Sequence, residues 1–139
     1  MGQQLRVLVA EDEPLVRGLV ALAFEAEGYA VDTAADGAEA LAIACAQTPQ
    51  AIVLDLMMPV MNGWDFLEAW QGQPTSRAVP IVVISAGGRR EEQAPLDVQA
   101  YLTKPFDIDR LIATVTGLVE AMWPPAEAVG QQPRTATGG

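Results

Sequence analysis

Five short apolar runs alternate with longer segments of helical spacing, and this alternation limits the fold more than any other feature of the chain. The strand-like runs cover residues 5–10, 30–33, 51–54, 81–84 and 100–103. Strands that alternate with helices in this way are typical of a parallel sheet with helices on both faces. We therefore predict an α/β fold with a doubly wound, five-stranded parallel sheet.

The helical segments between these runs have recognisable boundaries. The first helix is expected to begin at Pro14 and to end near Glu27, where Gly28 can take a left-handed conformation. Apolar residues recur with helical spacing from Ile108 to Met122, which predicts an amphipathic last helix. The expected N-caps of the second, third and last helices are Asp36, Asn62 and Asp107.

The chain is long enough for one compact domain. It has 139 residues, half of them hydrophobic, which suits a single core and leaves no room for a second folded unit. We assign residues 1–123 to the domain. Residues 124–139 are rich in Pro, Gly and Gln, and we predict a flexible tail because such a segment buries little apolar surface. The tail could be a native end or a linker to another domain.

The charge of the chain excludes several partners. With 18 acidic and 8 basic residues the net charge is −10, so nucleic acid phosphates and anionic lipids are repelled and direct nucleic-acid binding is not expected. No run approaches the ~18 apolar residues of a membrane span, and we expect a cytoplasmic protein. The chain has no histidine, which excludes Ser-His-Asp hydrolysis, histidine-ligated zinc and a phosphohistidine of its own.

Four isolated residues have simpler interpretations. The single cysteine, Cys45, lies in an apolar pattern and is predicted to be buried. Trp64 and Trp70 are predicted to be core or half-buried residues of the third helix. Trp123, beside Pro124, is the better candidate for contact with a partner.

Polar residues stand at the ends of four predicted strands. Glu11 and Asp12 follow the first strand, Asp55 the third, Ser85 the fourth and Lys104 the fifth. Ligands of an open parallel sheet bind at the carboxyl ends of its strands, where the strand order reverses. We therefore expect these side chains to share one pocket.

Three carboxylates in one pocket repel one another unless a cation lies between them. Hard oxygen ligands favour Mg²⁺, which takes one or two carboxylates together with water and phosphate oxygens. Asp55 is the best nucleophile, because a carboxylate can form an acyl phosphate, and Lys104 can neutralise charge on the transferring group. Ser85 could hydrogen-bond a phosphoryl oxygen.

In these motifs the chain resembles the receiver domain of bacterial two-component response regulators, from about Leu5 to Met122. The matching stretches are residues 7–14 (VLVAEDEP), 52–63 (IVLDLMMPVMNG), 81–86 (IVVISA) and 101–106 (YLTKPF). The resemblance implies a flavodoxin-like (βα)5 fold and a phosphoacceptor in a phosphorelay. The absence of an effector domain from this sequence favours a stand-alone receiver, and a receiver cut from a larger protein is the alternative. A histidine kinase or histidine phosphotransfer protein would be the donor, an unknown output protein the target, and a phosphorylation-dependent dimer is left open.

The resemblance also assigns roles to individual residues. It implies that Asp55 is phosphorylated and that Glu11, Asp12, Asp55 and the backbone carbonyl of Met57 hold Mg²⁺. It implies that Ser85 and Lys104 grip the phosphoryl group and that Tyr101 is a switch residue that turns inward. Pro105 suggests a cis peptide bond after Lys104.

The interval between Ser85 and Lys104 is shorter than usual in the family and contains Gly87, Gly88 and Pro95. Glycine costs a helix about 1 kcal/mol and interior proline about 3 kcal/mol, so the fourth helix is predicted to be short or disordered, with at most two turns over residues 89–94. We further hypothesise that phosphorylation orders this segment.

Two other functions compete with a phosphoacceptor switch. A pseudo-receiver would bind partners without being phosphorylated, but it usually lacks the acceptor, the acidic pair or the lysine, and all are present here. A flavodoxin-like electron carrier or an aspartate-based phosphatase shares the architecture. The acidic loop after the first strand would repel a flavin phosphate, and a phosphatase needs a second acid where this chain has Met57. A receiver changes state stoichiometrically, so we do not expect a turnover enzyme.

Overall fold

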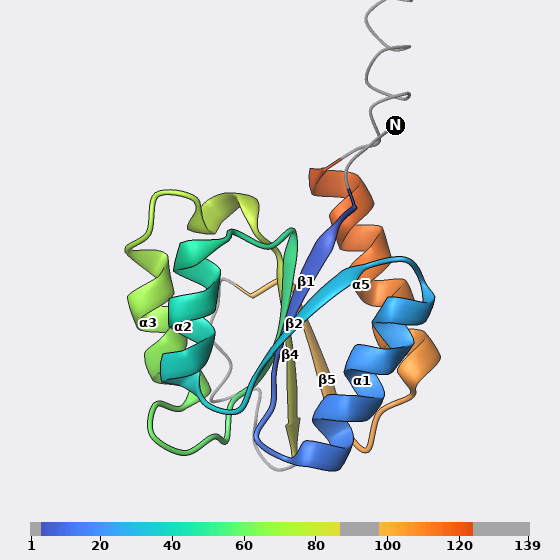
Figure 1. The fold of residues 1–139 in the computed structure, drawn as a ribbon, viewed down its shortest axis with the longest axis horizontal. Helices are drawn as coiled ribbons and strands as arrows, with labels where there is room; N and C mark the ends of the chain where they lie inside the picture. Colours follow the sequence, from blue (N-terminus) through green and yellow to red (C-terminus); the bar gives the residue numbers. More distant parts are fainter. Residues whose placement is uncertain (1–3, 87–97, 124–139) are drawn as a thin grey trace, which may run out of the picture.

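The computed structural model describes residues 4–86 and 98–123. Five parallel strands form one sheet in the order β2-β1-β3-β4-β5 (Figure 1). The strands are β1 (Arg6–Ala10), β2 (Ala30–Ala34), β3 (Ala51–Asp55), β4 (Ile81–Ala86) and β5 (Ala100–Lys104). The predicted doubly wound, flavodoxin-like sheet is confirmed.

The helices cover both faces of this sheet (Figure 1). The helices α1 (Pro14–Ala26) and α5 (Ile108–Met122) lie on one face, and α2 (Gly37–Ala46) and α3 (Gly63–Gln71) lie on the other. A short 3₁₀ helix, η1 (Ser76–Ala78), follows α3 and was not predicted. Because both faces are covered, β3 is buried along its whole length, which explains its uninterrupted apolar sequence.

Local sequence determines where the helices begin. Asp36 Oδ1 accepts a hydrogen bond from Glu39 N at 2.8 Å, and Asn62 Oδ1 accepts one from Asp65 N at 2.9 Å. The α5 helix is also capped, since Asp107 Oδ1 accepts a hydrogen bond from Asp109 N, the second residue of the helix, at 2.9 Å. The three predicted N-caps are therefore confirmed, each worth about 1 kcal/mol.

The first helix begins at Pro14 as predicted and ends at Ala26, one residue earlier than expected. Gly28 has φ 97°, the left-handed conformation that a side chain resists, and this stops the helix.

Two apolar clusters hold the layers together. On the α1 and α5 face, Phe24 and Tyr29 meet edge to face with centroids 5.5 Å apart. On the α2 and α3 face, Phe66 and Trp70 stack with centroids 6.2 Å apart. Each fully buried side chain of this kind contributes about 1.5–3 kcal/mol, so the core keeps the carboxyl ends of the strands in a fixed arrangement.

The prediction for Cys45 was wrong, because its side chain is exposed. The buried residues of α2 include Ala40 and Ala44, which share one face at a spacing of four. Cys45 lies one position further on, about 100° around the helix axis. Apolar residues occupy every position of the helix except Glu39, so their pattern did not indicate which face packs.

The predicted tryptophan environments are confirmed for the third helix: Trp70 is buried and Trp64 is half-buried. Trp123 is half-buried against the cluster on the α5 face, and its contact with a partner stays a prediction. The expected short fourth helix and the expected tail lie outside the described residues. Within 4–86 and 98–123, no helix is long and apolar enough to cross a membrane.

Candidate functional site

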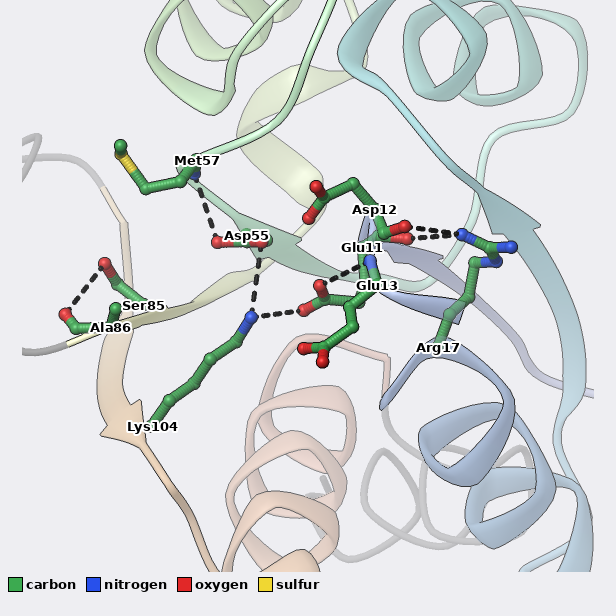
Figure 2. Close-up of polar contacts among 9 residues, drawn as sticks. All are labelled: Glu11, Asp12, Glu13, Arg17, Asp55, Met57, Ser85, Ala86 and Lys104. Carbon is green, nitrogen blue, oxygen red and sulfur yellow. Dashed lines mark hydrogen bonds and ion pairs between the residues drawn. The ribbon is translucent and has the colours of Figure 1, made fainter. Parts of the chain in front are cut away.

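The sheet topology brings the polar strand ends together as predicted. The strands β1 and β3 are neighbours at the point where strand order reverses, and β4 lies next to β3. Glu11 and Asp12 follow β1, and Asp55 is the last residue of β3. Lys104 is the last residue of β5, one strand beyond β4, and its long side chain spans that strand to reach the pocket (Figure 2).

An ammonium lies between two buried carboxylates at the centre of this site. Lys104 Nζ is 2.8 Å from Glu11 Oε1 and 3.3 Å from Asp55 Oδ2 (Figure 2). Glu11 is fully buried and Asp55 is 2% exposed, whereas the Lys104 side chain keeps 22% of its surface exposed. The second carboxylate oxygen of Glu11 accepts a hydrogen bond from Glu13 N at 3.0 Å. Two buried charges are thus paired by one partly exposed cation.

Burial dominates the protonation of Asp55. The pKa of Asp55 is raised from 3.8 to about 7: desolvation by burial is the largest cause and the charge of Glu11 adds to it, while a hydrogen bond from Met57 N and the Lys104 ammonium partly oppose the rise. In the metal-free protein, a proton therefore competes for this carboxylate near neutral pH. A group with a strongly perturbed pKa in an acidic cluster is a candidate for chemistry.

The same contacts act on Lys104. Burial lowers the pKa of its ammonium, but the hydrogen bond with Glu11 and the charges of Asp55 and Glu11 outweigh burial and raise the pKa above 10.5. Lys104 therefore stays charged at neutral pH, as a group that neutralises phosphoryl oxygens must.

The site could hold a divalent cation. One carboxylate oxygen from each of Glu11, Asp12 and Asp55 lies within 4.8 Å of the other two. Asp12 is exposed and the other two are buried, so a bound ion could keep water on its open side. An all-oxygen donor set with room for water suits Mg²⁺.

The loop after β3 is held by main-chain contacts. Met57 N donates to Asp55 Oδ1 at 3.1 Å, and Gly63 N donates to Leu56 O at 2.9 Å. Met61 N donates to Pro59 O at 2.7 Å, closing a three-residue turn around Val60, whose φ is 69°. The Met57 side chain is 60% exposed, so this residue contacts the pocket through its main-chain N–H and not through its side chain.

The start of α2 supports this loop from the other side. Gly37 N donates to Met61 O at 2.8 Å, and a Cβ added at Gly37 would lie 2.2 Å from that oxygen. A Cβ added at Gly63 would lie 2.7 Å from Asp55 O. Both positions therefore need glycine because another main chain approaches them closely. The sequence alone did not reveal the role of Gly37, since many helices begin with glycine.

Ser85 and Tyr101 are near the site but not part of the ionic cluster. Ser85 is 6% exposed, and its hydroxyl points to Ala86 O at 3.4 Å, away from Lys104 (Figure 2). Tyr101 packs against the apolar cluster on the α3 face, and its hydroxyl oxygen is buried. The Lys104–Pro105 peptide bond is cis, as predicted.

One residue of the site escaped sequence reasoning. Arg17 reaches back from α1, and its Nη1 lies 2.9 Å from Glu11 O and 3.3 Å from Asp12 O (Figure 2). In the sequence Arg17 is simply an arginine one turn into the first helix, and such a residue is ordinarily interpreted as a surface charge.

The fold and this pocket define a class of protein: flavodoxin-like domains with an acidic cluster and a lysine at the switch point of the sheet. A family model described as the response regulator receiver domain matches residues 7–116. The chain therefore belongs to the response regulator receiver domain family.

Curated relatives agree with this assignment. The alkaline phosphatase synthesis transcriptional regulatory protein SphR of Synechococcus elongatus is 39% identical over 126 residues, covering 82% of this chain and 48% of that protein. The response regulator PleD of Caulobacter vibrioides is 40% identical over 116 residues, covering 81% of this chain and 26% of PleD. The chain spans about half the length, or less, of such relatives.

The chain covers nearly the whole length of solved receiver structures. The chemotaxis response regulator CheY4 of Vibrio cholerae superposes with a TM-score of 0.76 at 32% identity, covering 84% of this chain and 99% of CheY4. The receiver domain of the Francisella response regulator 1452 has a TM-score of 0.77 at 33% identity, covering 85% of this chain and 98% of that domain. Receiver domains act as phosphoacceptor switches rather than as classical enzymes.

Proposed function

We propose that the chain accepts a phosphoryl group on Asp55 from a phosphohistidine of a partner protein and changes its affinity for an output protein. The observation that carries this proposal is the buried Asp55 carboxylate, which has an ammonium at 3.3 Å and two further carboxylates within reach of one cation. The chain has no histidine, so the donor histidine lies outside this sequence. We also propose that the protein is located in the cytoplasm.

The chemistry follows from the groups around Asp55. A carboxylate oxygen attacks phosphorus and forms an acyl phosphate, while the bond between phosphorus and the donor nitrogen breaks and its electron pair returns to the imidazole. Lys104 neutralises charge on the phosphoryl oxygens, and Glu11 holds the ammonium in place. We propose that small phosphodonors react by the same route, with the domain catalysing its own phosphorylation and hydrolysis.

A magnesium ion is part of the proposal. The carboxylates of Glu11, Asp12 and Asp55 and the backbone carbonyl of Met57 would hold it. When bound, it would screen the carboxylates from one another and neutralise charge on the transferring group. The proton that competes for Asp55 near neutral pH would then be displaced, and the nucleophile would stay ionised.

Two further residues would transmit the change. We propose that Ser85, whose hydroxyl now faces Ala86 O at 3.4 Å, turns to a phosphoryl oxygen. Its weak present contact makes that rotation inexpensive. Tyr101 lies one strand away on β5, and we propose that it follows Ser85 as the switch residue. The segment at residues 87–97, which is outside the described residues, is where we expect the output to be read.

The donor's docking surface is proposed to lie on α1. Leu15, Leu19 and Leu22 share one face of this helix and are 83%, 60% and 66% exposed. Leu19 also lines a cavity of about 380 Å³, whose wall consists mainly of apolar side chains of α1 and the β5–α5 region and includes Lys104. An apolar patch continuous with the phosphoacceptor pocket suits an amphipathic helix that carries the donor histidine.

A phosphorylation assay tests the chemistry. The protein is incubated with Mg²⁺ and acetyl phosphate, and its intact mass is measured, with beryllofluoride and tryptophan fluorescence as a second readout. We expect a labile phosphate adduct that is absent in Asp55→Ala and present in Asp65→Asn, which alters an exposed carboxylate of α3. No adduct and no beryllofluoride response in the wild-type protein would favour the pseudo-receiver.

Docking is tested separately from chemistry. Leu15→Ser and Leu19→Ser should slow transfer from a histidine kinase that phosphorylates the wild-type protein, yet leave the acetyl phosphate reaction unchanged. Leu5→Ser, at the opposite end of the sheet, is the matched control. Equal transfer rates in all three variants would show that the kinase docks elsewhere.

A further inference from the structure

Arg17 ties α1 to the acidic loop by contacts with the main chain. Its Nη1 donates to Glu11 O at 2.9 Å and approaches Asp12 O at 3.3 Å. These are the carbonyls of the two acidic residues that follow β1, and Figure 2 shows the guanidinium reaching back to them from the helix. One side-chain nitrogen therefore bridges two consecutive residues of the candidate metal site.

The position of Arg17 is unfavourable unless these contacts compensate for it. Arg17 is the fourth residue of α1, near the helix N-terminus, where the helix dipole disfavours a positive charge. It is also the only Lys or Arg between Pro14 and Ala26. The two carbonyl oxygens of Glu11 and Asp12 provide that compensation. The N-cap residue, Glu13, makes no side-chain capping bond, so Arg17 is the side chain of α1 that holds the preceding loop.

The side-chain carboxylates of Glu11 and Asp12 differ in how firmly the structure holds them. Both oxygens of Glu11 have partners, Lys104 Nζ at 2.8 Å and Glu13 N at 3.0 Å, and the side chain is fully buried. Asp12 is exposed, and the described structure shows no hydrogen bond or ion pair to its carboxylate. For Asp12 the contact of Arg17 with the main chain is the constraint that the structure shows, so the direction of its side chain depends on that contact.

We propose that Arg17 is a positioning residue for magnesium binding: it fixes the peptide carbonyls of Glu11 and Asp12 so that the Asp12 carboxylate faces the pocket. This inference rests on the proposed function, because it assumes that the acidic cluster holds Mg²⁺. Arg17 itself touches neither the ion nor the phosphoryl group. Residues that orient metal ligands in this indirect way typically change metal affinity 10- to 100-fold when they are replaced.

Charge and positioning predict opposite results, which makes the inference easy to test. Removing a positive charge near a cation site should strengthen Mg²⁺ binding if only electrostatics matters. Loss of loop positioning should weaken it. A mainly structural role would lower the unfolding temperature and leave the Mg²⁺ affinity unchanged.

The experiment is a Mg²⁺ titration of the full chain by calorimetry, with intrinsic fluorescence as a second readout because Trp64 lines a groove that includes Asp12 and Met57. The variants are Arg17→Gln, Arg17→Lys and, as the matched control for charge, Arg6→Gln. Arg6 begins β1 at the other end of the sheet and pairs with Asp32 at 3.1 Å. Thermal unfolding of each variant establishes that it is folded at the titration temperature.

We expect Arg17→Gln to bind Mg²⁺ about tenfold more weakly than the wild-type protein. Arg17→Lys keeps the charge but lacks the planar fork, so its affinity should fall about threefold. Arg6→Gln should stay within about twofold of wild type. Wild-type or tighter binding in both Arg17 variants overturns the inference. Absence of Mg²⁺ binding by the wild-type protein would instead refute the proposed function, and this inference with it.

Discussion

The raised pKa of Asp55, the proposed phosphoacceptor, predicts that this residue destabilises the metal-free protein at neutral pH. The pKa of Asp55 in the folded protein is about 7, against 3.8 for a solvated aspartate such as that of the unfolded chain. A carboxyl group with a raised folded-state pKa stabilises the fold below its unfolded pKa, and this contribution is lost as the pH rises through the folded value. Stability should therefore fall between about pH 4 and pH 7 because of this one residue.

The perturbation that isolates this effect is Asp55→Asn, which keeps the shape of the side chain and cannot titrate. Between about pH 5 and about pH 8, stability changes only over the two or so pH units that lie below the folded pKa. At ~1.4 kcal/mol per unit, the loss of stability in the wild-type protein is at most about 3 kcal/mol. Solvent screening at the open Asp12 side reduces this to about 2 kcal/mol. The stability advantage of Asp55→Asn should grow by that amount over the range.

The assay is urea unfolding of both proteins at several pH values, first in EDTA and then in Mg²⁺. In EDTA the two stability curves should diverge as the pH rises, and in Mg²⁺ the divergence should shrink because the ion neutralises the carboxylate. Asp65→Asn, with an exposed side chain, should follow the wild-type curve. Parallel curves for the wild-type protein and Asp55→Asn in EDTA would refute the reasoning.

Three further predictions concern single side chains. Gly37→Ala places a Cβ 2.2 Å from a loop carbonyl oxygen and should cost about 2–3 kcal/mol in urea unfolding, whereas Gly18→Ala, with open space around it, should be neutral or stabilising. Lys104→Met leaves the buried Glu11 without its ion pair and should cost about 3 kcal/mol in the same assay without Mg²⁺, the low end for a buried pair because the Lys104 side chain keeps 22% of its surface exposed. An unchanged midpoint would contradict this prediction. Cys45 should react with a thiol reagent in the native state at the rate of an exposed cysteine. A Cys45 that reacts only after unfolding would show that its side chain is buried.

Local sequence was sufficient for the five strands, for the helix starts at Pro14 and after the three caps, and for the end of α1 to within one residue, but not for η1. Pro14, Gly28 and the caps Asp36, Asn62 and Asp107 act within one turn of their own positions, so their effects do not depend on the rest of the fold. The alternation of strands and helices implied a parallel sheet, and parallel strands place all their carboxyl ends at one edge. For this reason the sequence also predicted that Glu11, Asp12, Asp55 and Lys104 would meet.

Tertiary structure decided the features that depend on distant neighbours. Which face of α2 is buried, and hence that Cys45 is exposed, depends on how the helix lies on the sheet, because apolar residues occupy nearly all of its positions. The contact of Arg17 with the acidic loop and the contact of Gly37 with Met61 O join elements whose approach no local pattern encodes. The pKa of Asp55 likewise follows from burial by the assembled layers. Sequence thus determined which groups gather at the pocket, and packing determined their orientation, their charge and the main-chain contacts that hold them there.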